Sequence, residues 1–336
     1  MSARASDDLP VAPRWRTTRR VAGYAAATTM SCYLVVKAVW VFAGLADGSP
    51  SGSGMSTSEW ITLNVASIVM SATGAALGIA IAQPWGNLLP AGPVVFFAWI
   101  GSGLLVPMIP YMLAAAALSA TSLDDSAHES AASSSASIPG WESILLNVGF
   151  AGMALGLAVG LPIYLRERWP SAFVATAPPA SARNAARQRS VVLLALLLPA
   201  VVGIATAFWA TAGSGPGVSA AYRDGPDARL LDANTAGWSL LGAFTVWRLI
   251  ARPQAHAAAK RVIAFVVSGH LFGWSAWRLA ALAFGPDSFE PTRAVGVAVV
   301  EYAASIAAGV AMLAVVLRSC VRSRELHPAR EPDAAR

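Results

Sequence analysis

Four ionisable residues interrupt long apolar stretches of this sequence: Lys37, His270, Arg278 and Glu301. A charged side chain near the middle of a bilayer costs about 2.5 to 3.5 kcal/mol, so such residues usually pair, become hydrated or serve a function. Counted from the middle of each apolar stretch at about 1.5 Å per residue, Lys37, Arg278 and Glu301 share one depth, roughly 6 to 8 Å from the membrane midplane. Their common depth predicts a charged layer in the outer half of the membrane.

We expect Glu301 to pair with Arg278, with Lys37 close by, because an acid between two bases offsets part of the cost of burying all three charges. Asn64 and Asn147 lie about a turn further out and could hydrogen-bond into this net positive cluster. The cluster fits an anion or solute site, or the coupling ion pair of a transporter. The alternative is a structural ion pair that fixes helix register, with Lys37 extending outward along its apolar stem.

His270 lies near the midplane, two turns before Arg278 on the same apolar stretch. Histidine has an ordinary pKa near 6.5, which suits a proton pathway. The alternative is a neutral packing histidine that is bonded to a neighbouring serine or carbonyl. The sequence leaves both interpretations open.

Membrane-spanning helices must position these residues. Of the 336 residues, 56% are hydrophobic and 12% are charged, and the mean hydropathy is +0.55, which is typical of a bilayer protein. A helix needs about 20 apolar residues to cross roughly 30 Å of hydrocarbon. The sequence predicts an all-α, polytopic transmembrane bundle of about eight helices, of which the sixth is the shortest. The predicted helices span residues 21–45, 60–82, 93–118, 142–165, 190–212, 236–251, 262–284 and 294–317.

Residues 21–317 form the predicted bundle, and residues 1–20 and 318–336 are basic tails. When the connections are assigned alternately to the two sides, most of the 24 basic residues fall on one side, which the positive-inside rule makes cytoplasmic. We therefore expect a multi-pass protein of the plasma membrane with both termini in the cytoplasm. The alternative is that residues 21–46 are a cleaved signal peptide, because TTRR precedes an apolar run that ends in small residues.

Glycines recur at helical spacing in three of the predicted helices. Such faces allow two helix backbones to approach closely, either within one chain or between the chain and partner membrane helices. The predicted helix-packing glycines are Gly74, Gly78, Gly152, Gly156, Gly160, Gly269 and Gly273.

The junction between the second and third predicted helices reads QPWGNLLPAGP and continues as VVFFAWIGSGLLVP. This pattern, with the preceding ITLNVASIVMSATGAALGIAIA, resembles uncharacterised multi-spanning integral membrane proteins of actinobacteria. The resemblance covers about 60 residues and implies a polytopic membrane protein, but it carries no known activity and no catalytic or binding residues. In physical terms, PWG and LP predict a tight, uncharged turn with Trp85 at the membrane interface.

The sequence contains no zinc-protease, P-loop, nucleophile-elbow or paired-aspartate membrane motif. Only one of the four histidines lies in a predicted helix, and the basic residues are dispersed, so we expect no catalysis, cofactor, metal or nucleic-acid partner. The leading hypothesis is a non-catalytic membrane scaffold or accessory protein whose partners are the lipid bilayer and other membrane helices. The alternative is a small-solute or ion transporter that uses the charged cluster, and its substrate is left open.

Overall fold

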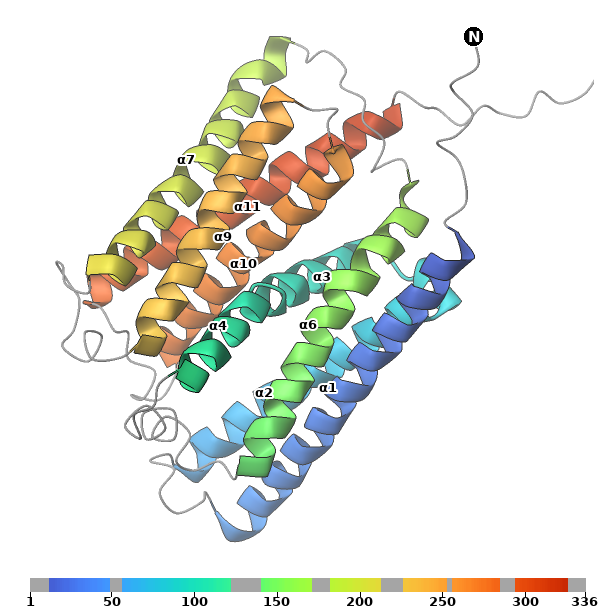
Figure 1. Ribbon diagram of the computed structural model, residues 1–336, viewed down its shortest axis with the longest axis vertical. Coiled ribbons are helices and arrows are strands. Elements are labelled where there is room, and N and C mark those ends of the chain that lie inside the picture. The colour runs from blue at the N-terminus through green and yellow to red at the C-terminus, as the bar shows by residue number, and fades with distance from the viewer. Residues whose placement is uncertain are drawn as a thin grey trace, which may run out of the picture.

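The computed structural model describes residues 12–48, 56–121, 140–170, 182–212, 226–252, 256–284 and 294–325. These residues form helices and short turns, with no strand among them, so the prediction of an all-α polytopic bundle is confirmed. Figure 1 shows two groups of helices separated by a helix pair, α3 and α4, that runs between them. This layout decides which of the intramembrane charges can meet.

The N-terminal helix group consists of α1 (Pro13–Asp47), α2 (Thr57–Ala82) and α6 (Gly140–Arg168). A capping box begins α2, in which the Ser56 side chain accepts a hydrogen bond from the backbone N–H of Glu59 and the Glu59 carboxylate accepts one from the backbone N–H of Ser56. The helices pack closely because glycines of α2 and α6 face small residues of α1. A Cβ on Gly78 would lie 2.8 Å from the backbone nitrogen of Ala27, and one on Gly156 would lie 2.8 Å from the carbonyl oxygen of Ala22.

The third membrane span is broken into α3 (Ala91–Leu105) and α4 (Met108–Thr121). The span predicted over residues 93–118 is present, but its helix is interrupted at Val106 and Pro107, and the reason is Pro107. Proline has no backbone N–H and its ring collides with the preceding turn, so a helix kinks or ends there. Hydropathy alone does not register this break, because residues 91–118 stay apolar throughout.

The C-terminal helix group consists of α7 (Ala182–Ala212), α9 (Pro226–Ala251), α10 (Ala257–Phe284) and α11 (Val295–Glu325). Each of these helices packs against two others of the group: α7 on α9, α9 on α10, α10 on α11 and α11 on α7. The group is therefore a closed four-helix bundle. On its outside, α3 packs against α10 and α4 packs against α9.

Seven helices of the described chain are long and apolar enough to cross a membrane, counting the third span as one. The eighth long helix, α9, is not among them, because charged and amide side chains lower its hydropathy. The prediction of a short sixth helix over residues 236–251 is wrong, since α9 begins ten residues earlier at Pro226. Helices α1 and α11 also extend past residues 21 and 317, where we placed the bundle boundaries, to Pro13 and Glu325.

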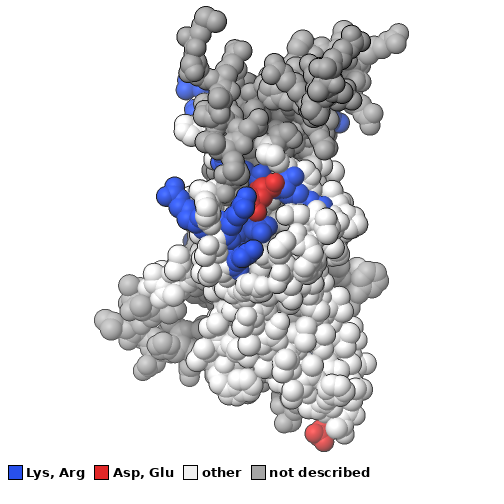
Figure 2. Space-filling model, turned by 90° about the vertical axis from the view of Figure 1, so that its right-hand side faces the viewer, with Lys and Arg blue, Asp and Glu red and all other residues white. Residues whose placement is uncertain are grey.

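Basic side chains gather at one end of the bundle, as the band of Lys and Arg in Figure 2 shows for one face. Three contacts join helix ends there. Arg19 of α1 forms an ion pair with Glu167 of α6, with 3.2 Å between Nη1 and Oε2. Lys260 of α10 donates to the carbonyl of Arg248 of α9 over 3.1 Å, and Arg261 donates to Ser319 of α11 over 3.2 Å. The first turns of α1 and the last turns of α11 therefore lie at the same end. Which side of the membrane this end faces stays a prediction.

At this end, the turn predicted from PWG and LP is a short 3-10 helix, η1 (Pro84–Leu88). Arg168 holds it in place by donating to the carbonyls of Gly86, over 3.0 Å, and Leu89. Tyr164 donates to the same Gly86 carbonyl over 2.7 Å. Only glycine fits at position 86, since a Cβ would lie 1.8 Å from the carbonyl oxygen of Ala80.

We expect Arg168→Lys to destabilise the folded protein by about 1 to 3 kcal/mol, because an ammonium cannot reproduce the planar fork of a guanidinium on two carbonyls. Denaturant titration of the purified protein in detergent would measure the change in the free energy of unfolding. The matched control is Arg166→Lys, because Arg166 lies on the same turn of α6 but is exposed. Equal stability of the two variants would contradict this role of Arg168.

Candidate functional site

Three of the predicted site residues line one small cavity inside the C-terminal half of the protein. His270 and Arg278 come from α10, and Glu301 comes from α11. Helices α9 and α4 complete the wall. The remaining lining residues are Met108, Leu231, Thr235, Leu271, Trp274, Ser275 and Ser305. The cavity has room for about one water molecule.

Helical spacing explains why these side chains share the cavity. His270, Trp274 and Arg278 are four residues apart on α10, and Glu301 and Ser305 are four apart on α11, so each set occupies one face of its helix. Glu301 is 8% exposed and His270 is 2% exposed, so both are removed from the lipid face of the bundle. The Arg278 guanidinium lies 5.9 Å from the centre of the Tyr302 ring on α11. The site thus combines a base, an acid, an imidazole and three hydroxyls in apolar surroundings.

His270 also lies beside the break in the third span. Its ring is within hydrogen-bonding reach of the backbone of Gly103, and its Nδ1 is buried without a hydrogen-bond partner among the described residues. In a continuous helix the carbonyl of Gly103 would accept from the N–H of residue 107, but Pro107 has none. One turn further along α10, Trp274 donates to the carbonyl of Leu104 over 3.1 Å. Residues of α10 therefore face two carbonyls at the break.

Close contact between backbones fixes α10 against α3. A Cβ on Gly103 would lie 2.1 Å from the carbonyl carbon of Gly269, and one on Gly269 would lie 2.2 Å from the carbonyl oxygen of Trp99. Nearby, Trp99 donates from Nε1 to the Ser268 hydroxyl over 2.8 Å, and its ring packs on Phe272 with centroids 4.7 Å apart. The position of His270 relative to the third span is therefore rigidly defined.

Lys37 lies away from this cavity, which corrects our expectation that it accompanies Arg278 and Glu301. It belongs to α1, which packs mainly on α2 and α6, whereas α10 and α11 lie on the other side of the third span (Figure 1). Its Nζ lies 3.8 Å from the centre of the Trp40 ring and 5.5 Å from that of Tyr33, in a cation–π arrangement. Equal depth in the membrane did not imply lateral proximity.

The two predicted asparagines also belong to the N-terminal helix group. Asn64 is 2% exposed, and its amide donates to the carbonyl of Trp60 in its own helix over 2.8 Å. Asn147 is exposed on α6. Neither lines the cavity that contains His270, Arg278 and Glu301.

Asp232 is a buried acid that sequence reasoning missed. It lies on α9, is 4% exposed, and is next to the cavity-lining residue Leu231. The predicted sixth helix begins at residue 236, so it leaves Asp232 outside the predicted membrane spans. Pro226 could have indicated that the helix starts earlier, because proline is favoured in the first turn of a helix. Asn234 follows two residues later and has a buried Nδ2 without a hydrogen-bond partner among the described residues.

All seven predicted packing glycines lie at contacts between helices of this chain. Gly74 and Gly152 face Met30 and Thr29 of α1, and Gly273 faces Leu104 of α3.

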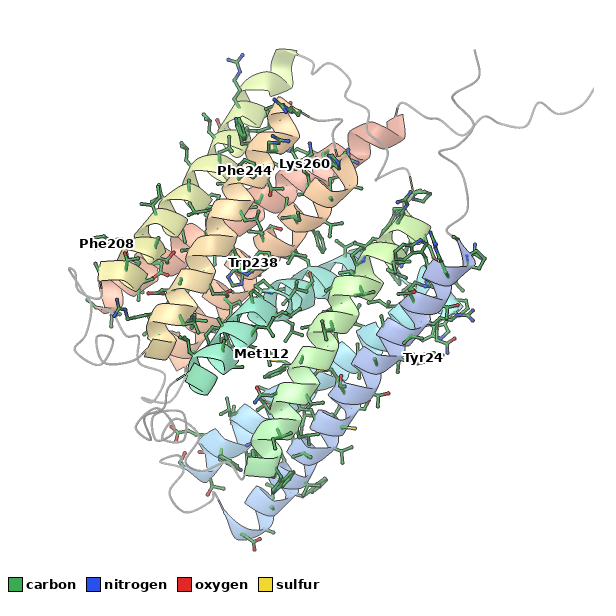
Figure 3. The ribbon with its side chains drawn as sticks, in the orientation of Figure 1. Tyr24, Met112, Phe208, Trp238, Phe244 and Lys260 are labelled. Carbon is green, nitrogen blue, oxygen red and sulfur yellow. The ribbon has the colours of Figure 1, made fainter. Side chains whose placement is uncertain are left out.

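Side chains at both ends of the C-terminal helix group are shown in Figure 3, where Lys260 marks the basic end of α10. Among the described residues, no group of three or more His, Cys, Asp or Glu side chains could hold a metal ion.

Fold and site together define a polytopic helical membrane protein with a buried, charged cavity. The chain matches no protein-family model, no curated protein and no solved structure. The resemblance to actinobacterial membrane proteins stays a prediction.

Proposed function

We propose that this protein is a non-catalytic membrane transporter for a small ion, with its binding site at the cavity between α4, α9, α10 and α11. The observation that carries the proposal is the convergence of His270, Arg278 and Glu301 on one cavity inside an apolar bundle. Ionisable residues are costly in the membrane and usually mark ion or substrate pathways.

The composition of the cavity exceeds what a structural ion pair requires. A pair that only fixes helix register needs one acid and one base in tight packing, as in the Arg19–Glu167 pair at the basic end of the bundle. Here Arg278 and Glu301 share the cavity wall with a histidine and the hydroxyls of Thr235, Ser275 and Ser305, which come from three helices. Hydroxyl and carboxylate oxygens from several helices are typical ligands for a dehydrated ion.

The broken third span supports the same proposal. Non-helical backbone at membrane depth is tolerated where it is covered by protein or lines a cavity, and discontinuous helices form the ion sites of many transporters. Met108, the first residue of α4, lines the cavity directly after the break. The residue that follows the break is therefore part of the cavity wall.

The scaffold hypothesis, which the sequence alone favoured, loses one of its arguments. It relied on glycine faces that could bind partner helices. Those faces are covered within the chain: Gly152 and Gly156 pack on α1, Gly78 packs on α1, and Gly269 packs on α3. A partner helix would need a different surface.

We also propose that the basic end of the bundle faces the cytoplasm, as the positive-inside rule predicts, and that the protein resides in the plasma membrane. The ion site then lies in the outer half of the bilayer. It would be reached from the outside first.

A flux assay tests the proposed transport. Purified protein reconstituted in liposomes is expected to move one of H⁺, Na⁺, K⁺ or Cl⁻ down an imposed gradient. Glu301→Gln, which removes the charge but keeps the size, is expected to reduce that flux at least about tenfold, corresponding to about 1.4 kcal/mol. The control is Lys37→Gln, because Lys37 lies outside the cavity. Equal fluxes through wild type and Glu301→Gln, or no flux through wild type, would refute a transporter at this site.

A further inference from the structure

We infer that the ion is a proton and that Nδ1 of His270 is its acceptor; this inference rests on the proposed function and names the ion. The size of the cavity is the first reason. It holds about one water molecule in this conformation, which is enough to deliver a proton but not to admit a hydrated metal ion or an organic solute.

The unpaired nitrogen of His270 is the second reason. His270 is 2% exposed and lines the cavity, yet its Nδ1 has no hydrogen-bond partner among the described residues. Buried polar atoms are usually satisfied, so a buried atom without a partner calls for water or a ligand. A ring nitrogen that serves as an acceptor takes a proton or a donor such as water.

The backbone of Gly103 supplies the third reason. A neutral imidazole has one N–H donor, whereas an imidazolium has two, and each needs an acceptor when it is buried. Pro107 leaves the Gly103 carbonyl without its helical donor, and the His270 ring lies within reach of that backbone. A protonated His270 can therefore donate to Gly103 on one side and to a cavity water on the other.

The surrounding charges allow a proton to be held and released. On the facing elements, Glu301 of α11 lines the cavity, whereas Asp232 of α9 is buried next to the lining residue Leu231 but does not itself line the cavity. Arg278, which also lines the cavity, lies on α10 itself. Helix α3 contains no titratable residue, and α4 contains only Tyr111. Glu301 favours an added positive charge at the cavity and Arg278 opposes it, so a proton taken up by His270 can also be released.

Proton flux in liposomes with an internal pH-sensitive dye is the first test. We expect wild type to conduct protons along an imposed pH gradient and His270→Gln, which keeps the size and polarity of the side chain, to lower the rate at least tenfold. If a metal ion or chloride is transported and depends on Glu301 but not on His270, the transporter stands and the proton inference fails. Absence of any ion flux would refute the transporter itself.

Histidine-specific ¹⁵N NMR is the second test and does not depend on flux. The protein has four histidines, so loss of one signal in His270→Gln assigns the ring. We expect that ring to change reversibly between neutral and protonated forms as the external pH is lowered. A ring that stays neutral over the whole range in which the protein is folded would overturn the inference.

Proline substitutions test the role of Gly103 with a matched control. Pro107→Ala restores the N–H that competes with His270 for the Gly103 carbonyl, so we expect it to change the ring ¹⁵N signals and to lower proton flux several-fold. Pro110→Ala is the control, because the Val106 carbonyl that Pro110 would leave free already accepts from Ile109 over 3.1 Å. Equal effects of the two substitutions would show that Gly103 does not help to hold the proton.

Discussion

Gly103→Ala is expected to destabilise the folded protein by about 3 kcal/mol or more, at the upper end of the usual cost of overpacking. The added Cβ would lie 2.1 Å from the carbonyl carbon of Gly269 and 2.4 Å from the backbone nitrogen of His270. Both are backbone atoms, so no rotamer change can relieve the collision and α3 must move away from α10. Denaturant titration in detergent would measure the loss, and the hydrogen bond from Trp99 to Ser268 should weaken with it, which tryptophan fluorescence would report.

Two other glycines provide matched controls for this substitution. A Cβ on Gly92 of α3 or on Gly237 of α9 meets no atom within 4 Å. Alanine at either position is expected to leave stability unchanged or to raise it by up to about 1 kcal/mol, because alanine is the better helix former. If Gly103→Ala were as stable as Gly92→Ala, the close crossing of α3 and α10 would be wrong.

If Arg278 and Glu301 pair as predicted, reversing either charge is expected to cost about 3 to 5 kcal/mol, because a buried charge then loses its compensation. Arg278→Glu places two acids at the cavity, and Glu301→Arg places two bases there. The double reversal should recover part of the loss, since it restores one acid and one base. Unfolding in detergent measured for the two single variants and the double variant completes the cycle and yields the coupling energy.

Lys37 provides the comparison for this cycle. It has the same predicted depth as Arg278 but lies among Trp40 and Tyr33 in the N-terminal helix group. Lys37→Glu combined with Glu301→Arg should therefore show additive costs, within about 0.5 kcal/mol. A double reversal of Arg278 and Glu301 that is no more stable than either single variant would refute their pairing.

Hydropathy predicted the number and order of the long helices, because each segment must cover the same thickness of hydrocarbon. It failed where polar residues belong to a helix. The first turns of α9 contain Asp227, Arg229 and Asp232, so the predicted helix began at residue 236 instead of Pro226. Arg229 is held at that end by hydrogen bonds to the carbonyls of Ala210 and Thr211 in α7, a tertiary contact that no local pattern reveals.

The break in the third span could have been anticipated from VPMIP, since prolines disrupt helices, but an average over 18 or more apolar residues conceals it.

For the candidate site, depth was predictable and lateral position was not. The spacing of residues along a helix fixes how deep Arg278 and Glu301 lie, and consecutive helices α10 and α11 pack side by side. Lys37 illustrates the limit of such reasoning, because α1 joins α2 and α6 through glycine contacts. The sequence also does not predict that the Gly103 carbonyl is available to His270. That availability depends both on the kink at Pro107 and on the crossing of α3 and α10.

The glycine crossing between α3 and α10 has a mechanical consequence for the whole molecule. Because the backbones touch there, we expect α3 to move together with the C-terminal helix group if the two helix groups shift. On the side of α3 that faces the N-terminal helix group, an added Cβ on Gly101 would meet side chains at ordinary contact distance, 3.5 Å from Leu157 and 3.9 Å from Leu77. We therefore expect any sliding between the two helix groups to occur along a plane on the side of α3 that faces α2 and α6. The polar cavity lies entirely on the other side of that plane.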